Sequence, residues 1–368
     1  MLKTLLLLIL LTCGNNSYSI AQGFEVEFND LQTPASPGFA LLDETPESIA
    51  RPSTPQGLAL NFISLVQGSG AALEVAPYWL KVHEGLDAKK QLSNLFPFGQ
   101  TFSLSAATVK NENTTFVAGG MRFRFLRLYS DKQLQDYQTH LGAINSTALA
   151  IARNKVRQVQ VNDSVSKLNN SDGSRLLKLE LMAKLETLKK EADDIASNFD
   201  EPAQKGIEVI ENPFFSIDFA AALGGGSETD SYKDLQLQKW AVWTNLNFSW
   251  SDKFSSTLLG RYLDNLGSEI IDEAEESEVA EFQGYDLGGR LNWDIARKIC
   301  LSAEYIQRFY NQSDISSQNR LAAIGSFKIY DNVYATATFG KNFGEVQNII
   351  ALGGITLGIS ENKQTFIQ

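Results

Sequence analysis

The chain has 368 residues, enough for one large domain or two. It carries 43 acidic and 32 basic side chains, and this excess of negative charge argues against nucleic acid as a partner. With two histidines and two cysteines in all, we expect no metal cluster built from these residue types, and no cofactor is predicted.

Residues 1–21 have the pattern of a secretory signal peptide. Lys3 is followed by the apolar run Leu5–Leu11, and residues 19–21 (SIA) supply small side chains at the ends of a cleavage site. The apolar run is too short to cross a bilayer as a helix. Cleavage would leave Gln22 as the first residue of an exported protein.

The two cysteines have different fates in this interpretation. Cys13 lies in the predicted signal peptide, and a lipoprotein-type cleavage before it is an alternative that Thr12 disfavours. Cys300 is then the single cysteine of the exported chain, so no intrachain disulfide is expected.

The next segment, 22–69, is predicted to be an N-terminal periplasmic or plug segment. Thr33–Leu42 is punctuated by prolines and is expected to be extended. Thr54-Pro55 places a capping residue before proline, which suits a helix start. The expected helix runs through Leu58 to Leu65, and it would lie in the periplasm or in the lumen of a barrel.

The stretch Pro34–Leu80 combines a Pro-Ala-Ser-Pro segment, a proline-initiated helix and a first strand that reads ALEVAPYW. In this order it resembles uncharacterised outer-membrane proteins of Bacteroidota-type bacteria. The resemblance implies a β-barrel, and it brings no known activity and no site residues.

The clearest strand in the chain is Lys239–Ser251, which reads KWAVWTNLNFSWS. Its even positions are apolar from Trp240 to Trp250 apart from one threonine, and its odd positions are mostly polar. Ten residue steps span roughly 33 Å. At a tilt of about 45° this covers roughly 23 Å, close to the ~25 Å apolar band of an outer-membrane barrel. The pattern therefore favours an antiparallel transmembrane β-barrel.

Alternating runs recur from residue 70 to the end, so 70–368 is assigned to the barrel. Eleven runs are clear, and Lys205–Glu211 is added as a twelfth because bacterial barrels have even strand numbers; ten strands is the alternative. The predicted strands are Ala71–Leu80, Gln100–Val109, Thr114–Leu128, Lys205–Glu211, Phe214–Leu223, Leu235–Ser251, Phe254–Asp264, Val279–Asp294, Lys298–Phe309, Asn319–Tyr330, Asn332–Lys341 and Ile349–Ser360.

Residues 131–202 change to the spacing of helices. Apolar residues recur every three or four positions on both sides of the turn-forming run Asn169–Ser174, which predicts an inserted helical hairpin. The hairpin would be a docking arm, a cap over a pore or a self-packed loop. Because it follows the third predicted strand, we expect it outside the cell, on the same side as the acidic loop Asn265–Glu278.

The charged residues of the predicted strands fall at alternate positions that face the same side of the sheet, and we call this their phase. A charge on the lipid side costs about 2–4 kcal/mol near the midplane, so these residues are predicted to face inward. They would line a watered pathway with weak anion preference, or they would pair and hold the interior closed. The predicted pore-lining residues are Arg122, Arg124, Asp218, Arg261, Asp286, Arg290, Glu304, Arg308, Arg320 and Lys328, with Glu74 and Asp294 on the same face.

Signals for catalysis are few, and no enzyme is predicted. His83 is expected in the first outer loop and His140 in the helical arm, and no motif sets a serine beside either. Gly224–Gly226 lacks the lysine of a phosphate loop. The acidic residues between 269 and 281 match no cation-binding spacing, and they read as a solvated loop.

These patterns predict a protein of the cell outer membrane in contact with its lipid. The leading function is a porin-like channel for small solutes. The alternative is a non-conducting scaffold, or a subunit of a cell-envelope complex that binds an envelope protein through the helical arm.

Overall fold

The structure is a computed structural model of the whole chain. It describes residues 24–27, 36–42, 47–50, 57–65, 68–81, 83–84, 97–111, 115–168, 172–197, 200–227, 235–251, 253–266, 281–296, 298–312, 316–330, 333–343, 349–358 and 363–366. The predicted signal peptide and the acidic run from 269 to 280 lie outside the described residues.

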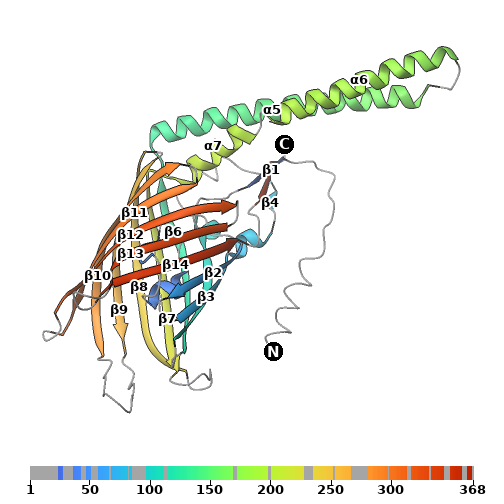
Figure 1. Ribbon diagram of the computed structural model, residues 1–368. Helices are drawn as coiled ribbons and strands as arrows, with labels where there is room; N and C mark the ends of the chain where they lie inside the picture. The colour runs from blue at the N-terminus through green and yellow to red at the C-terminus, as the bar shows by residue number, and fades with distance from the viewer. Residues whose placement is uncertain are drawn as a thin grey trace.

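Within these ranges, twelve antiparallel strands close into one barrel (Figure 1). Each strand pairs with the next along the chain, and β14 pairs with β2 to close the ring. The predicted fold class is therefore confirmed. The strands are β2 Leu58–Leu65, β3 Gly68–Val75, β5 Ser103–Asn111, β6 Thr115–Leu128, β7 Phe215–Ser227, β8 Gln236–Ser251, β9 Phe254–Asn265, β10 Phe282–Ala296, β11 Ile299–Tyr310, β12 Gln318–Tyr330, β13 Val333–Lys341 and β14 Ile349–Gly358.

Two elements differ from the sequence prediction and offset each other in the strand count. Leu58–Leu65, predicted to be a helix, is the first barrel strand β2, so the barrel begins at residue 58 and not at 70. Lys205–Glu211, predicted to be a strand, belongs to helix α7 (Asp200–Glu211). A run of seven or eight residues is too short to distinguish the two-residue period of a strand from the 3.6-residue period of a helix. The barrel needs a strand that pairs with β14, and α7 packs on the helix next to it.

The two ends of the barrel carry different connections. We call the end where β2 begins and β14 ends the terminal end, and the opposite end the loop end. At the loop end lie the connections 228–235, 266–281, 311–317 and 342–348, and at the terminal end the later connections are 252–253, 297–298 and 331–332.

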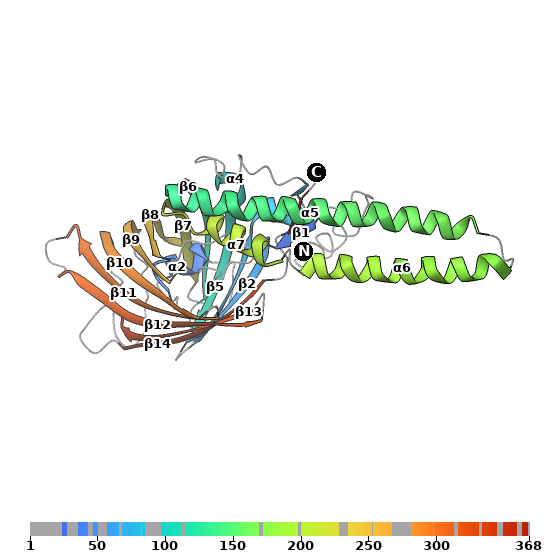
Figure 2. The ribbon, with the colours of Figure 1, turned by 90° about the horizontal axis from the view of Figure 1, so that it is seen from above.

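A helical insertion joins β6 to β7 at the terminal end. It consists of α5 (Asp131–Ser166), α6 (Asp172–Ser197) and α7, so it extends to residue 211 rather than 202. Helices α5 and α6 run side by side and project well beyond the barrel (Figures 1 and 2). We call this pair the arm. Its longer helix measures about 54 Å at 1.5 Å per residue.

The arm lies at the end opposite to the one expected from the sequence. The prediction placed it on the side of the 265–278 loop, yet β9 reaches Asn265 at the loop end whereas β6 ends at the terminal end. The physical reason is β2. This additional first strand makes β6 the fourth strand, and the fourth strand of an antiparallel barrel returns to the end where the first began.

The lumen is filled by a short segment that precedes β2. Helix α2 (Pro37–Leu41) lies inside the ring of strands (Figure 2), and the stretch Glu47–Ala50 hydrogen-bonds to inward-facing residues of β10 and β11. We call Ser36–Leu42 together with Glu47–Ala50 the plug. Thr33–Leu42 was expected to be extended. Instead, Ser36 accepts a hydrogen bond from the Phe39 amide at 3.3 Å and caps a helix that begins at Pro37.

The inner wall facing α2 is built from small residues. Phe39, Leu41 and Ile49 of the plug are buried in one cluster with the wall. The wall members that surround α2 from β3 to β8 include Ala72, Ala107, Ala118, Ala220, Ala222 and Ala241. Small side chains leave the space that the helix occupies. We call this side of the lumen the small-residue half.

The outer surface of the barrel is apolar. Outward-facing side chains such as Leu258, Leu291 and Tyr305 are about half exposed or more, while their chain neighbours are buried inside. Among the described helices, none is both long and apolar enough to cross a membrane.

Smaller elements gather at the terminal end. Strands β1 (Phe24–Glu27), β15 (Lys363–Phe366) and β4 (His83–Glu84) form a separate three-stranded sheet. The 3-10 helix η1 (Pro77–Leu80) and helix α4 (Pro97–Thr101) lie between β3 and β5. The Trp79 indole donates to the Gln100 carbonyl at 2.7 Å and links them.

Candidate functional site: the plugged lumen

The charged half of the lumen, formed by β9 to β12, is organised around two buried carboxylates. Asp286 accepts from Arg261 Nε at 2.7 Å and from Arg308 Nε at 2.8 Å. Glu304 is paired with Arg320 at 3.1 Å, and both side chains are fully buried. These pairs join neighbouring strands of the wall, because Asp286 faces both Arg261 and Arg308 in register.

The plug is bound to this half by its backbone and by one carboxylate. The Ile49 amide donates to Glu304 Oε2 at 2.8 Å, and the Ile49 carbonyl accepts from Arg290 Nη1 at 2.8 Å. Glu47 pairs with Arg290 at 2.9 Å. Arg261 donates to the Ala40 carbonyl at 3.2 Å. The charged side chains of the wall therefore hydrogen-bond to backbone groups of the plug, which belong to neither a sheet nor a long helix.

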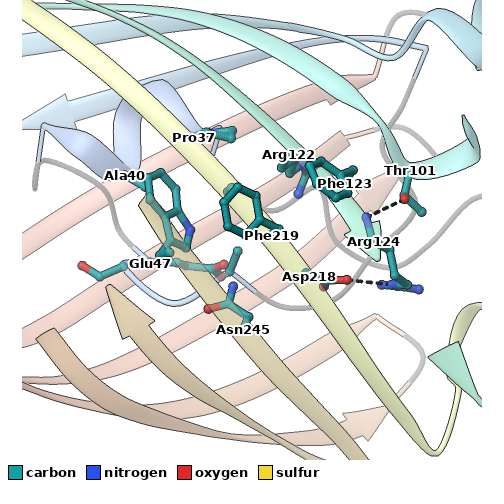
Figure 3. Close-up of a pocket in the computed structure, with 14 residues that line it drawn as sticks. Pro37, Ala40, Glu47, Thr101, Arg122, Phe123, Arg124, Asp218, Phe219 and Asn245 are labelled. Atoms are coloured by element: carbon teal, nitrogen blue, oxygen red, sulfur yellow. Dashed lines mark hydrogen bonds and ion pairs between the residues drawn. The ribbon is translucent and has the colours of Figure 1, made fainter. Parts of the chain in front are cut away.

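A second charged cluster lies toward the terminal end, where Figure 3 shows it around a cavity. Arg124 is paired with Asp218 at 2.8 Å, and its backbone amide donates to Thr101 Oγ1 at 2.7 Å. Arg122 is paired with Glu74 at 2.7 Å. The cavity between these groups and the plug measures about 30 Å³, room for about one or two water molecules.

Two buried polar atoms at this cavity have no hydrogen-bond partner among the described residues. They are Ser48 Oγ on the plug and Asn245 Oδ1 on β8, and each residue is 4 % exposed. Both residues line the cavity, together with Glu47. Buried polar groups are nearly always paired with protein or water, so this cavity is suited to hold water beside the plug.

The predicted pore-lining residues all come from inward-facing positions, and most are locked in pairs. Nine of them take part in the pairs described above: Arg122, Arg124, Asp218, Arg261, Asp286, Arg290, Glu304, Arg308 and Arg320. The tenth, Lys328, lies farther toward the terminal end, with its ammonium group 5.9 Å from the centre of the Tyr334 ring.

Sequence reasoning missed the plug's share of the site. Glu47, Ser48 and Ile49 showed no pattern of their own, since their role comes from contacts with strands more than 200 residues away. Ser36-Pro37 did carry a usable signal, because a capping residue before proline indicates a helix start. Asn292 and Ser302 share the inward phase, but they are uncharged.

The two histidines do not lie together. His83 falls in the two-residue strand β4 at the terminal end, so the prediction that it lies outside any strand is wrong. His140 lies in α5, where Gly206 of α7 packs close to its Cβ. Among the described residues, no group of three or more His, Cys, Asp or Glu side chains is placed to hold a metal ion.

The base of the arm is a rigid joint. The side chain of Gln133 accepts from the Ser130 amide at 3.0 Å and from the Phe214 amide at 3.1 Å, and it donates to the Asn212 carbonyl at 2.7 Å. Tyr129 donates to the Ile210 carbonyl at 2.7 Å, and burial raises the pKa of its phenol. One glutamine thus ties the start of α5 to the end of α7.

Comparison with known proteins finds structural likeness at low scores only. No protein-family model matches the chain, and no curated protein matches it. Among solved structures, the KdgM porin is similar with a TM-score of 0.38 at 10% identity, over 82% of this chain and 97% of that one. The outer membrane channel DcaP of Acinetobacter baumannii is similar with a TM-score of 0.27 at 8% identity, over 93% and 70%.

The beta domain of the Bordetella autotransporter BrkA is also similar, with a TM-score of 0.34 at 10% identity over 82% of this chain and 97% of that one. These are outer-membrane barrels or channels of several kinds. The likeness concerns the barrel alone, and the resemblance of Pro34–Leu80 to Bacteroidota-type proteins stays a prediction.

Proposed function

We propose that the protein is an outer-membrane barrel that serves as a porin-like channel for small solutes and is closed at rest by its N-terminal plug. This proposal rests on what obstructs the lumen. A separate segment fills the lumen between walls that keep a charged inner surface. An eight-stranded barrel is filled by its own side chains, and barrels of 16 to 18 strands leave an aqueous channel. Twelve strands lie between these cases.

The location follows from the two faces of the wall. Apolar side chains cover the outside and charges gather inside, as in barrels that stand in lipid. Short turns lie on the periplasmic side of such barrels and longer loops outside. From β7 onward the terminal end carries the short turns and the loop end the longer loops, and on this part of the barrel the rule sets the terminal end, with the arm, in the periplasm and the loop end outside.

A reversible lock on the plug tests the channel. A Cβ at Gly38 would lie 3.0 Å from the Ala107 Cβ, near the spacing of a disulfide once the helix shifts by about 0.5 Å. We expect Gly38→Cys/Ala107→Cys protein to be silent in planar bilayers when oxidised and to show conductance steps when reduced. Cysteines at the register partners Leu291 and Ala303, which tie wall to wall, are the matched control and should not respond to oxidation.

Silence of the reduced protein would contradict the channel. The voltage and salt range should be wide, because buried ion pairs hold the plug and openings will be brief. Steps that persist unchanged with the lock closed would contradict the role of the plug.

A second candidate function is a non-conducting scaffold that holds a partner through the arm. The Gln133 joint favours it, because a rigid base fixes the direction in which the arm projects. Large apolar side chains are also exposed in the part of the arm that α7 does not cover: Leu149, Val156, Val159, Leu176, Leu179 and Met182.

The side on which the arm lies is open to direct measurement. Cysteines at Leu176 and at Tyr310, near the loop end of β11, should differ in labelling on intact cells by a membrane-impermeant maleimide. We expect reaction at Tyr310 and protection at Leu176 until the outer membrane is permeabilised. Labelling of Leu176 on intact cells would contradict a periplasmic arm.

A further inference from the structure

The guanidinium of Arg290 is held by a carboxylate that belongs to the plug. Arg290 Nη1 lies 2.9 Å from Glu47 Oε2, and Nη2 donates to Glu47 Oε1 at 3.1 Å. Only the Nη2 contact has the geometry of a hydrogen bond, because Nη1 donates to the Ile49 carbonyl and approaches Oε2 as an ion pair. Ser326 Oγ approaches the same carboxylate at 3.5 Å.

The wall supplies two further contacts that orient this guanidinium, beside the Ile49 carbonyl of the plug, which accepts from Nη1. Arg290 Nε donates to Asn292 Oδ1 at 2.7 Å, and Nη2 donates to Ser302 Oγ at 2.9 Å. Ser302 in turn donates to Asn292 Oδ1 at 2.9 Å. All three side chains are more than nine-tenths buried. The fork is therefore oriented by β10 and β11, and it keeps its place when the carboxylate leaves.

The neighbouring pairs are built differently. Asp286 and Glu304 are wall residues, so Arg261, Arg308 and Arg320 keep these carboxylates when the plug moves. Arg290 loses Glu47 in the same movement. A buried cation that has lost a carboxylate partner is costly, which creates a strong demand for another carboxylate at this point of the wall.

We propose that Arg290, Asn292, Ser302 and Ser326 form a carboxylate-recognition site, that Glu47 occupies it at rest, and that a small carboxylate-bearing solute replaces Glu47 when the plug moves aside. This inference rests on the proposed channel and names its substrate class. Flat, two-point binding suits a carboxylate, and the serine hydroxyls allow a third contact.

The water-sized cavity supplies the approach. It borders Glu47 and Ser48 on the side away from β10 and lies among Arg122, Arg124 and Asp218 (Figure 3). Water in this cavity would hydrate the Glu47 carboxylate as it leaves Arg290.

The test measures movement of the plug and not conductance. A cysteine at Ser48 in the full-length protein is labelled by a small charged methanethiosulfonate in detergent or lipid, with or without succinate. We expect succinate and acetate to speed labelling about tenfold, because they compete with Glu47 for Arg290. Acetamide, neutral and of the same shape as acetate, should have no effect.

Two variants localise the effect. In Arg290→Gln, labelling should be fast without any additive and should not respond to succinate. Arg308→Gln removes a buried guanidinium that is paired with Asp286 of the wall, and it should keep the succinate response. Acceleration that survives Arg290→Gln, or an equal effect of phosphate and succinate, would overturn the proposal.

A second measurement serves if Arg290→Gln does not fold. In Glu47→Ala, the melting temperature should fall, and acetate but not acetamide should restore it. Absence of rescue would overturn the site. Faster labelling with succinate in a protein that never conducts keeps the carboxylate site and contradicts the channel. Conductance without any succinate effect would keep the channel and contradict the carboxylate site.

Discussion

Around α2, the inner wall from β3 to β8 presents mainly alanine and glycine, and its charged residues lie apart, toward the terminal end; the wall from β9 to β12 presents arginine, glutamate and aspartate to the plug. The small-residue half holds α2 by shape, since Gly70, Gly120 and Gly224 each leave room that a side chain would take from Phe39, Pro37 or Leu41. The charged half holds Glu47–Ala50 by hydrogen bonds.

This difference separates where the plug lies from how it is released. Packing against small residues is non-directional, and it places the helix without a chemical trigger. Ion pairs in a buried site are directional, and they respond to any ligand that can replace one partner. A plug seated by shape and fastened by charge can therefore be released from one side.

The largest effect is expected in the charged half. Asp286→Ala leaves Arg261 and Arg308 without their shared carboxylate, and the free energy of unfolding in lipid vesicles should fall by about 3–5 kcal/mol. Urea titration of the refolded barrel measures it. A loss below about 1 kcal/mol would mean that water reaches these arginines in the resting state.

Overpacking the small-residue half comes next. A Cβ at Gly120 would lie 2.7 Å from the Pro37 Cβ, so Gly120→Val should cost about 1–3 kcal/mol and push the plug outward. Limited proteolysis of the plug reads out the displacement. Gly119→Val is the matched control, since a Cβ there comes no closer than 3.8 Å to a neighbour. Equal effects at the two positions would argue against a seat defined by shape.

A single hydrogen bond in the small-residue half should matter less. Ser105 accepts from the Gly38 amide at 3.2 Å, and Ser105→Ala should cost about 1 kcal/mol. Labelling of a cysteine at Ser48 should quicken by less than in Glu47→Gln, because the ion pair fastens the plug more strongly. Faster labelling in Ser105→Ala than in Glu47→Gln would mean that contacts in the small-residue half, and not the ion pair, hold the plug in place.

The smallest effect is expected where the same charge chemistry is exposed. Lys167 pairs with Asp163 on the arm, and both side chains are more than half exposed. Lys167→Ala should change the free energy of unfolding by at most about 0.5 kcal/mol, and less at high salt. Urea titration at low and high salt checks it. A larger change would show that burial is not what separates the lumen pairs from the arm pairs.

Much of the barrel was readable from the sequence because its rules are local. Side chains alternate across a strand, and lipid penalises charge on one face, so the phase of Arg290 or Glu304 could be assigned residue by residue. The helices of the arm were equally readable, since α5 and α6 are long enough for their spacing to be unambiguous.

Short elements were not readable, and they decided the topology. Leu58–Leu65 and Lys205–Glu211 are too short for their periodicity to tell a strand from a helix. Because the first is a strand and the second is helical, the arm lies at the other end of the barrel from the one predicted. The structure settles both through partners far along the chain: β14 for the first segment and α5 for the second.

Periodicity and the cost of charge in lipid act position by position, so the antiparallel barrel, its inward charges and the helical insertion could be inferred from the residues alone. Which groups the inward charges pair with depends on the folded barrel. Glu47 faces Arg290 across 243 residues of chain, and no local pattern encodes such a pairing. Closure of the ring brings the plug and the wall together, and with them the site.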